Sequence, residues 1–526
     1  MPEKLARYSI AAIAWCLALG VAAFALLTFW QSRYQAIEWD LAMMHYIAWL
    51  INEKGFILYR DVFENNFPGA FLFQSLLGKF FGYDALPLRV VDFFILAGIG
   101  VFSWKILAPL SRPAAIFCPA MFAVIYLSNG SYVFLQRDYI AILPVLIASA
   151  HLLSKKTCRL RDFILAGALC GFSCGFKPNV IVAFPALFLV AATRYSVAST
   201  TGSGFFRLYT KPFLSMSLAF TAVFSIPFIW GIWHCDYAQL VYIYKTFTPI
   251  YLNSRIDLFQ YANSEEHMRA LLDSQLHQFR NTAMSCLPGL GWAWFVNAGN
   301  IDNRKRIRDI AIIIFAFSWY ELMAGKYWFA HLLPTYFWNT LGFSLLLSLP
   351  ARFSTIGKKA GAASTVFIAA GLSIYLCNFL YLITPHDKYS SSNSHIRSQK
   401  IGAYLKQHLQ PGDTVQGIDG SGDGQGSLLI ARATPATRYL EDIPLYMQPD
   451  APATQAFRQE FLSTLAQKPP AYIVYIENFF HPAGGNRLAE FRQLNSFVQE
   501  NYEKAEVDDG QYIIYKRKYA TASKPQ

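Results

Sequence analysis

Residues 8–30 read YSIAAIAWCLALGVAAFALLTFW and contain no charged side chain. An apolar run of this length is what an α-helix needs to cross the hydrocarbon core of a bilayer. Lys4 and Arg7 precede the run, as in a secretory signal peptide, but the run is too long for that role and lacks a small-x-small cleavage site. We therefore predict a retained membrane span.

The composition extends this conclusion to the whole chain. The 526 residues are 54% hydrophobic, 16% aromatic and only 15% charged, whereas about a quarter of the residues of a soluble domain are charged. The formal net charge is +12. Because the basic clusters adjoin apolar stretches and no zinc-finger or RNA-binding motif occurs, we expect basic loops at a membrane face and no nucleic-acid partner.

Apolar runs of near span length recur and predict an α-helical polytopic membrane protein with about 11 transmembrane helices. The runs after the first are 88–108, 113–129, 138–154, 163–176, 179–193, 212–233, 284–298, 309–324, 332–350 and 361–384. Residues 36–51 and 67–81 are shorter and interrupted by polar groups, so we expect helices that lie along the membrane interface.

Basic residues fall on alternate loops, the pattern that sets membrane topology. The loops that carry them contain Lys4, Arg7, Arg112, Lys155, Lys156, Arg159, Arg161, Arg194, Arg207, Lys211, Arg304, Lys305, Arg306, Arg308, Arg352, Lys358 and Lys359. We expect this side to be cytoplasmic, in an inner or plasma membrane, with the N-terminus inside. Residues 1–385 then form a transmembrane domain with an external catalytic loop at about 31–87, and residues 386–526 form a periplasmic or extracellular domain.

The last part of the chain has the pattern of a soluble α/β domain. Helical periodicity occurs at 396–409, 457–466 and 488–502, and the strand-like segments are DTVQGI (413–418), AYIVYI (471–476) and QYIIYK (511–516). The Gly-rich stretch GIDGSGDGQG (417–426) lacks GxGxxG spacing and a GK[ST] ending, so we favour a flexible turn over a phosphate cradle.

Asp40 is the first candidate for chemistry, because a helix would place it on one face with Met44 and Ile47. A carboxylate in an apolar stripe is costly unless it is used or paired, and that setting suits a general base. The alternative is a helix cap or a salt bridge to Arg33 or Lys54.

The run Tyr59–Gly69, YRDVFENNFPG, follows with acids, a cation and a Pro-Gly turn. Such a loop can hold a site at the membrane surface. The alternative is an ordinary solvated turn in which Arg60 and Asp61 face water.

The stretch from Glu38 to Asp92 resembles the first external loop of GT-C glycosyltransferases of the polyprenyl-phosphate-sugar-dependent, protein-mannosyltransferase-like kind. The residues that carry the resemblance are Asp40, Gly55, Tyr59, Arg60, Asp61, Pro68, Gly69, Phe81, Gly82 and Arg89. The chain departs from the family pattern at Leu41, where Glu is common, and at Asn66-Phe67-Pro68, where Lys-Pro-Pro or Lys-Gly-Pro is common.

Weaker similarities to the same family continue along the chain. They lie in FLQRDYIAILP (134–144), GFKPN (175–179), GKYWFAHLLPTYF (325–337) and ATPATRYLED (433–442). The resemblance implies an integral-membrane inverting glycosyltransferase that passes a sugar from a polyprenyl-phosphate donor to an envelope acceptor, which is lipopolysaccharide, another glycan or a protein, on the external face.

This chemistry needs a carboxylate to deprotonate the acceptor hydroxyl and cations to hold the departing phosphate. We assign the first role to Asp40 and Asp61. The predicted phosphate-binding residues are Arg60, Arg89, Arg137, Lys177, Lys326 and His331, and further candidates are Asp138 and Arg438. The structural alternatives are ion pairs Arg89–Asp92 and Arg137–Asp138 at helix ends and snorkelling side chains at Lys177 and Lys326.

Two other functional classes remain open: a transporter or flippase of lipid-linked envelope intermediates, and a non-catalytic scaffold. Charges at span ends and the lack of an internal repeat disfavour a transporter.

We predict no cofactor and no metal site, although Asp40 and Asp61 together are an alternative divalent-cation site. Cys170 and Cys174 lack metal-ligand partners, and Cys235 and Cys286 are a weak candidate disulfide.

Overall fold

The computed structural model describes residues 2–32, 37–195, 205–254, 264–348, 394–477, 487–508 and 510–518. Contacts between residues divide the chain into two compact units. Unit 1 is Met1–Tyr34, Leu88–Phe228 and Met268–His386, and unit 2 is Gln35–Pro87, Ile229–His267 and Asp387–Gln526. This division differs from the single expected boundary near residue 385, because residues 35–87 and 229–267 group with the C-terminal residues.

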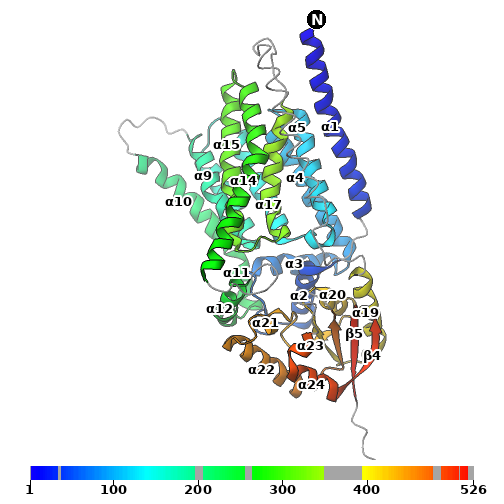
Figure 1. Cartoon of the computed structure of the whole chain (residues 1–526). Helices are drawn as coiled ribbons and strands as arrows, with labels where there is room; N and C mark the ends of the chain where they lie inside the picture. The colour runs from blue at the N-terminus through cyan, green and yellow to red at the C-terminus, as the bar shows by residue number, and fades with distance from the viewer. Residues whose placement is uncertain are drawn as a thin grey trace, which may run out of the picture. The chain divides into compact units, whose positions relative to one another are not determined.

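Unit 1 is helical in the residues that the structure describes (Figure 1). Its helices are α1 (Pro2–Ser32), α4 (Ala85–Leu107), α5 (Arg112–Ser128), η1 (Gly130–Val133), α6 (Arg137–Ile140), α7 (Ile142–Ser154), α8 (Leu160–Phe176), η2 (Pro178–Val182), α9 (Ala183–Ala192), α10 (Phe205–Phe224), α15 (Ile301–Phe317), α16 (Tyr320–Ala324), α17 (Phe329–Ser344) and η3 (Leu345–Leu347). Helix α11 (Ile226–His234) begins in unit 1 and ends in unit 2, and α14 (Ser264–Val296) runs from unit 2 into unit 1. The expected spans fall on these helices, except 361–384, which lies outside the described residues.

Several helices have the length and composition of membrane spans. Among the described residues, four segments are long and apolar enough to cross a bilayer: Ala11–Ser32, Ala85–Leu107, Arg137–Ser154 and Tyr209–His234. Large apolar side chains project outward from α1, α4 and α10, including Leu26, Phe94 and Leu218, each of which is more than half exposed. Such surfaces suit contact with lipid, since water would disfavour them. The expected total of about 11 spans stays a prediction.

Glycines allow close helix packing inside unit 1. A Cβ atom added at Gly167 would lie 2.1 Å from the carbonyl oxygen of Met216, and one added at Gly171 would lie 2.3 Å from that of Phe220. Helices α8 and α10 therefore approach backbone to backbone along a small-xxx-small stripe, the packing that lets helices associate in membranes. On another side of unit 1, α14, α15 and α17 run side by side (Figure 1).

Unit 2 combines two N-terminal helices with the C-terminal α/β domain (Figure 1). Its helices are α2 (Trp39–Lys54), α3 (Pro68–Phe81), α12 (Tyr237–Thr246), α13 (Thr248–Leu252), α19 (Ser394–His408), α20 (Asp423–Ala431), α21 (Ile443–Tyr446), α22 (Pro452–Gln467), α23 (Arg487–Glu490) and α24 (Arg492–Asn501). Its strands are β1 (Thr414–Ile418), β2 (Thr434–Pro435), β3 (Tyr472–Ile476), β4 (Tyr502–Asp508) and β5 (Tyr512–Arg517).

The strands form a five-stranded sheet in the order β2-β1-β3-β5-β4. Strand β1 runs parallel to β2 and β3, whereas β5 is antiparallel to β3 and β4. The central strand β3, YIVYI, is buried along its whole length. The strand-like segments expected at 413–418, 471–476 and 511–516 are confirmed, and β4 is an edge strand that the sequence analysis did not predict.

Helix α2 is buried within unit 2. Its side chains are buried from Leu41 to Ile51, and it packs between α3 and α20. Of α2 and α3, only α3 carries large exposed apolar groups, at Leu76, Phe80 and Phe81. The prediction of two helices was correct, and their position along the membrane interface stays a prediction.

Candidate functional site

Asp138 lies at the centre of a charged cluster in unit 1. The residue is fully buried at the start of α6. The Tyr320 hydroxyl donates a hydrogen bond to its Oδ1 at 2.5 Å, and Lys177 Nζ lies 3.2 Å from its Oδ2. Three segments distant in sequence therefore meet at one carboxylate. Asp138 forms an ion pair with Lys177, and the neighbouring Arg137 of the helix-end alternative lies within electrostatic range of the same carboxylate.

Further predicted cations surround this carboxylate. His331 lies within electrostatic range of Asp138, Lys177 and Arg137, and its Nδ1 is 3.3 Å from the carbonyl oxygen of Lys326. Lys326 is only 2% exposed. The structure thus brings three of the six predicted phosphate-binding residues, Arg137, Lys177 and His331, to Asp138, and Lys326 adjoins them through its carbonyl oxygen. Basic side chains grouped where the local dielectric is low can hold a phosphate strongly.

Two members of this cluster were missed by the sequence analysis. Tyr320 is the hydroxyl donor to Asp138, and the next residue, Glu321, is fully buried. Neither carboxylate oxygen of Glu321 has a hydrogen-bond partner among the described residues. A charged side chain inside a run predicted to span the membrane, 309–324, was the available indication, since such residues usually have a function.

Arg89 forms the ion pair with Asp92 that we gave as the structural alternative to phosphate binding. Its Nη1 lies 3.8 Å from Oδ2 of Asp92, and its guanidinium lies 3.5 Å from the centre of the Phe134 ring. Asp92 also accepts a hydrogen bond of 2.7 Å from the Tyr126 hydroxyl. These contacts give Arg89 a clear structural role, and its contact with phosphate stays a prediction.

Asp40 lies in unit 2, in the first turn of α2. An acidic side chain is favoured there by the partial positive charge at a helix N-terminus. The preceding residue, Trp39, has a φ of 55°, a left-handed conformation that is costly for a residue with a side chain. The helix therefore starts at a sharp change in chain direction, with Asp40 half-buried beside it.

The Gly-rich stretch 417–426 packs against this first turn. Gly422 has a φ of 85°, and a Cβ atom there would lie 2.6 Å from Cα of Trp39. Asp419 closes the loop by accepting hydrogen bonds from the backbone N–H groups of Ser421 and Gly424 at 2.7 and 2.8 Å. The stretch thus ends β1, turns, and begins α20 beside the first turn of α2, and the flexibility that we favoured for it stays a prediction.

The YRD run forms a turn closed by its own side chains. Asp61 accepts a hydrogen bond from the backbone N–H of Ile57 at 2.8 Å, and Arg60 donates two to its carboxylate at 3.0 and 2.8 Å. Burial alone would raise the pKa of Asp61, but these bonds outweigh it and lower the pKa. Arg60 is exposed, with 57% of its side chain accessible. The solvated-turn alternative therefore describes both residues well.

The rest of that loop is fastened to the C-terminal domain. The backbone N–H of Phe63 donates a hydrogen bond of 2.8 Å to the carbonyl of Arg438, and its ring stacks on Tyr439 with centroids 5.2 Å apart. Arg438 itself pairs with Glu460 at 2.6 Å and donates to Gln239 at 3.1 Å. Arg438, a further candidate from the sequence, thus ties together segments of unit 2.

Carboxylates, among them that of Asp40, gather around Glu441, a feature that the sequence did not indicate. Burial raises the pKa of Glu441 well above its usual value, and repulsion from Glu64, Asp40, Asp419 and Asp442 raises it further. At such a group the proton is held to high pH. This set of five carboxylates comes from four stretches of chain, at Asp40, Glu64, Asp419 and Glu441–Asp442, so no single local motif could have revealed it.

Two of these acids have evident partners. Burial raises the pKa of Asp442 to about 6, although its ion pair with Arg487 acts in the opposite direction. Glu64 is buried and accepts hydrogen bonds from the backbone N–H groups of Asn65 and Asn66 at 2.7 and 2.9 Å. These bonds order the loop that follows the YRD run.

Neither a metal site nor a disulfide is assigned. No group of three or more His, Cys, Asp or Glu residues has metal-binding geometry in the part of the chain that the structure describes. Asp61 is engaged by Arg60 and is not among the carboxylates that affect Glu441, which disfavours a joint Asp40–Asp61 cation site. Cys235 and Cys286 are both free, so the weak candidate disulfide is not formed.

Comparisons with known proteins address the fold. No protein-family model matches the chain, and no curated protein is similar to it in sequence. ArnT from Cupriavidus metallidurans in the apo state matches with a TM-score of 0.55 and 13% identity, over 96% of this chain and 98% of that one. ArnT from the same organism bound to undecaprenyl phosphate matches with a TM-score of 0.51 and 13% identity, over 97% and 99%. Both matches cover nearly the whole length of each chain.

The oligosaccharyltransferase of Archaeoglobus fulgidus, in complex with Zn and sulfate, gives a TM-score of 0.41 and 12% identity, over 89% of this chain and 68% of that one. The two ArnT structures confirm the fold that the sequence resemblance implied. The chain has the fold of these ArnT structures: a helical part with apolar helices long enough to cross a membrane, and a C-terminal α/β domain.

Proposed function

We propose that this chain is an inverting glycosyltransferase that moves a sugar from a polyprenyl-phosphate donor to an envelope acceptor. The observation that carries the proposal is the group of basic residues at the buried Asp138 in unit 1: Lys177 forms an ion pair with it, Arg137 and His331 lie within electrostatic range, and the buried Lys326 adjoins His331. Basic side chains gathered in this way suit a phosphate ligand. The bound ligand named for one ArnT structure, undecaprenyl phosphate, has the matching chemistry.

In the proposed reaction Asp40 accepts the proton of the acceptor hydroxyl while that oxygen attacks C1 of the sugar. The bond between C1 and the phosphate oxygen breaks, its electron pair leaves with the lipid phosphate, and the configuration at C1 inverts. The cations of unit 1 stabilise the charge on the departing phosphate. A phosphate leaves well without protonation, so the reaction requires no general acid.

The phosphate roles of the six predicted residues then differ. Arg137, Lys177, Lys326 and His331 form the group that we assign to the phosphate. Arg60 and Arg89 receive structural roles from their pairs with Asp61 and Asp92. The same reasoning makes Asp61 a residue that holds the loop, whereas Asp40 remains the proposed base.

The reaction is tested by incubating the purified full chain in detergent with a polyprenyl-phosphate sugar and a panel of envelope acceptors. We expect free polyprenyl phosphate and a glycosylated acceptor in equal amounts, with inverted configuration. Intact donor after incubation with every acceptor, together with its transfer between leaflets in vesicles, would support the flippase alternative instead.

We further propose that residues 386–526 lie on the external face of the membrane, with the N-terminus in the cytoplasm. The alternation of basic loops supports this orientation. An enzyme reporter that is active only outside the cytoplasm, fused after Gln526, is expected to be active. Activity of a cytoplasmic reporter at the same position would reverse the orientation.

A further inference from the structure

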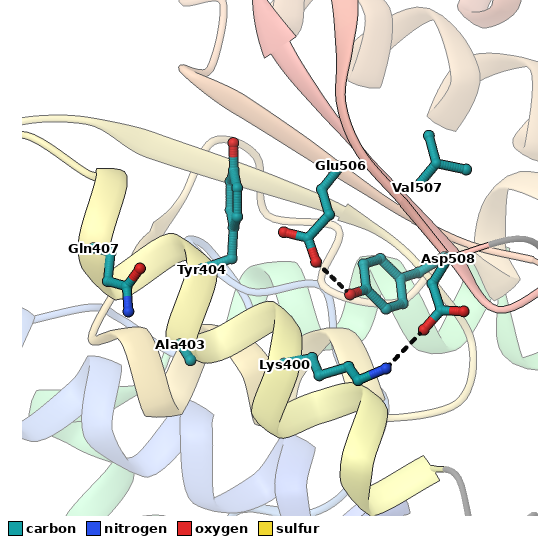
Figure 2. Close-up of a pocket in the computed structure, with 8 residues that line it drawn as sticks. Lys400, Ala403, Tyr404, Gln407, Glu506, Val507 and Asp508 are labelled. Atoms are coloured by element: carbon teal, nitrogen blue, oxygen red, sulfur yellow. Dashed lines mark hydrogen bonds and ion pairs between the residues drawn. The ribbon is translucent and has the colours of Figure 1, made fainter.

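A groove lies between α19 and β4 in the C-terminal domain (Figure 2). Its volume is about 580 Å³, within the range of small-molecule sites. The residues that line it are Lys400, Ala403, Tyr404, Gln407, Glu506, Val507, Asp508 and Tyr512. None of these residues is part of the cation cluster or of the carboxylates around Glu441.

The groove opens on one face of α19, and the opposite face of this helix packs against α20. On that packed face, a Cβ atom at Gly402 would lie 2.7 Å from Cβ of Ile430 in α20. Helix α20 in turn contacts α2, the helix of Asp40, at Gly426, where an added Cβ atom would lie 3.7 Å from Cβ of Ala42. The groove is therefore separated from Asp40 by two packed helices within the same unit.

The charges of the groove exclude an anionic ligand. Lys400 already pairs with Asp508 at 3.1 Å, and Glu506 adds a second carboxylate. A phosphate or sulfate would meet two carboxylates and one neutralised ammonium, and like charges in proximity disfavour binding. The exposed charged side chains also exclude a lipid tail, which would lose their hydration.

The remaining features match a polyhydroxylated ligand. Tyr404 stacks on His408 with one face, at a centroid distance of 4.1 Å, and Figure 2 shows its ring edge-on with the other face toward Glu506. The carboxylate of Glu506 is oriented by the Tyr512 hydroxyl at 2.7 Å. An aromatic face beside a fixed acceptor suits a sugar ring, which has an apolar C–H face and a rim of hydroxyl donors.

From this geometry we infer that the groove between α19 and β4 is a saccharide-binding site for uncharged sugars, separate from the proposed reaction centre. The sugar ring stacks on Tyr404 and donates hydroxyl hydrogen bonds to Glu506, and the Gln407 amide can donate to a ring or hydroxyl oxygen. Such a site holds a glycan segment on the domain that carries Asp40. The inference goes beyond the proposed function, because it requires binding and no turnover.

The test is saturation-transfer NMR on the purified full chain in detergent, with maltotriose, mannotriose and tri-N-acetylchitotriose as probes. We expect transfer to the ring protons of at least one trisaccharide. Tyr404→Ala and Glu506→Gln should each weaken that binding by at least 10-fold. Glu503→Gln is the matched control, because Glu503 is an exposed acid of the same strand outside the groove.

The inference is overturned if none of the three probes receives saturation, or if Tyr404→Ala and Glu506→Gln bind as well as Glu503→Gln. The unfolding midpoint of each variant establishes that the domain is intact. Loss of binding in all three variants would also overturn the inference. A chain that binds the trisaccharide but consumes no lipid-linked sugar would contradict only the proposed function.

Discussion

The charged clusters of the two units have opposite composition. In unit 1 the group around Asp138 is mainly basic: Lys177 pairs with Asp138, and Arg137 and His331 lie within electrostatic range of it. In unit 2, Glu64, Asp40, Asp419 and Asp442 all act on Glu441, and Asp442 forms an ion pair with Arg487. Under the proposed function, binding of the leaving phosphate and acceptance of the proton fall to different parts of the chain, each with the electrostatic environment that its role needs.

The largest expected effect comes from replacing Asp40, one of the carboxylates of unit 2. Asp40→Asn keeps the size of the side chain but cannot accept a proton, so turnover should fall by about 10²–10⁴-fold. Asp61→Asn is the matched control, since Asp61 is held by Arg60 and should lose less. Steady-state rates of lipid-linked sugar consumption give both numbers. A larger loss at Asp61 than at Asp40 would move the base to the YRD turn.

The next effect concerns the loop that packs against the first turn of α2. Gly422→Ala imposes a left-handed conformation on alanine, which costs about 1–2 kcal/mol, and forces the loop away from Trp39, which costs about 1–3 kcal/mol more. Gly510→Ala is the control, because Gly510 also has a positive φ of 74° but has nothing within 4 Å of an added Cβ. Chemical denaturation compares the two variants. Equal losses would show that the close approach to Trp39 does not contribute.

A smaller effect, a loss of affinity for polyprenyl phosphate, is expected when a basic residue of unit 1 is replaced. Arg137→Ala removes one charge-assisted contact worth about 1.5–3 kcal/mol, so the Kd for polyprenyl phosphate should rise by about 10–150-fold. Arg60→Ala is the control, since Arg60 is exposed in unit 2. Calorimetric titration measures both. If the yield of folded Arg137→Ala falls as steeply as its affinity, Arg137 is structural.

The smallest effect tests how deeply α2 is buried. Burial lowers the pKa of His45 to about 4, so between pH 6.5 and 4 the unfolded chain binds more protons and stability falls as the pH falls. At pH 5 the loss is about 2 kcal/mol. Asp442 acts oppositely, because its raised pKa of about 6 makes the folded state bind more protons between pH 6 and 3.8.

The wild-type pH profile therefore combines opposing contributions, and the difference from His45→Gln isolates His45. We expect the stability of the wild type relative to His45→Gln to fall by about 2 kcal/mol from pH 7 to pH 5. A difference that does not change with pH would mean that water reaches this helix.

The helices could be predicted from sequence because each apolar run is a local signal. Strands β1, β3 and β5 could be predicted for the same reason. Strand β2 has only two residues, and the exposed charged residues of β4 hide its pairing with β5. The burial of α2 could also have been predicted from sequence, because apolar residues on all sides of a helix indicate a core position.

The two clusters could be predicted only in part. Arg137, Lys177, Lys326 and His331 were found through short motifs, yet nothing local indicated that Lys177 pairs with Asp138 or that Tyr320 joins them. Glu64 and Glu441 lie within the quoted stretches 59–69 and 433–442, but neither stretch indicates that Glu64 and Asp40 come within electrostatic range of Glu441 in the folded chain. The role of Gly422 depends on a backbone approach to Trp39, which no single stretch of sequence encodes.

The separation of roles between the units is tested most directly by the Kd for undecaprenyl phosphate in Asp40→Asn, measured beside Arg137→Ala. The account predicts that Asp40→Asn binds within about twofold of the wild type while its turnover is at least about 10²-fold lower. Arg137→Ala should show weakened binding. A change of tenfold or more in the Kd of Asp40→Asn would contradict the account, because the acidic cluster would then take part in holding the phosphate.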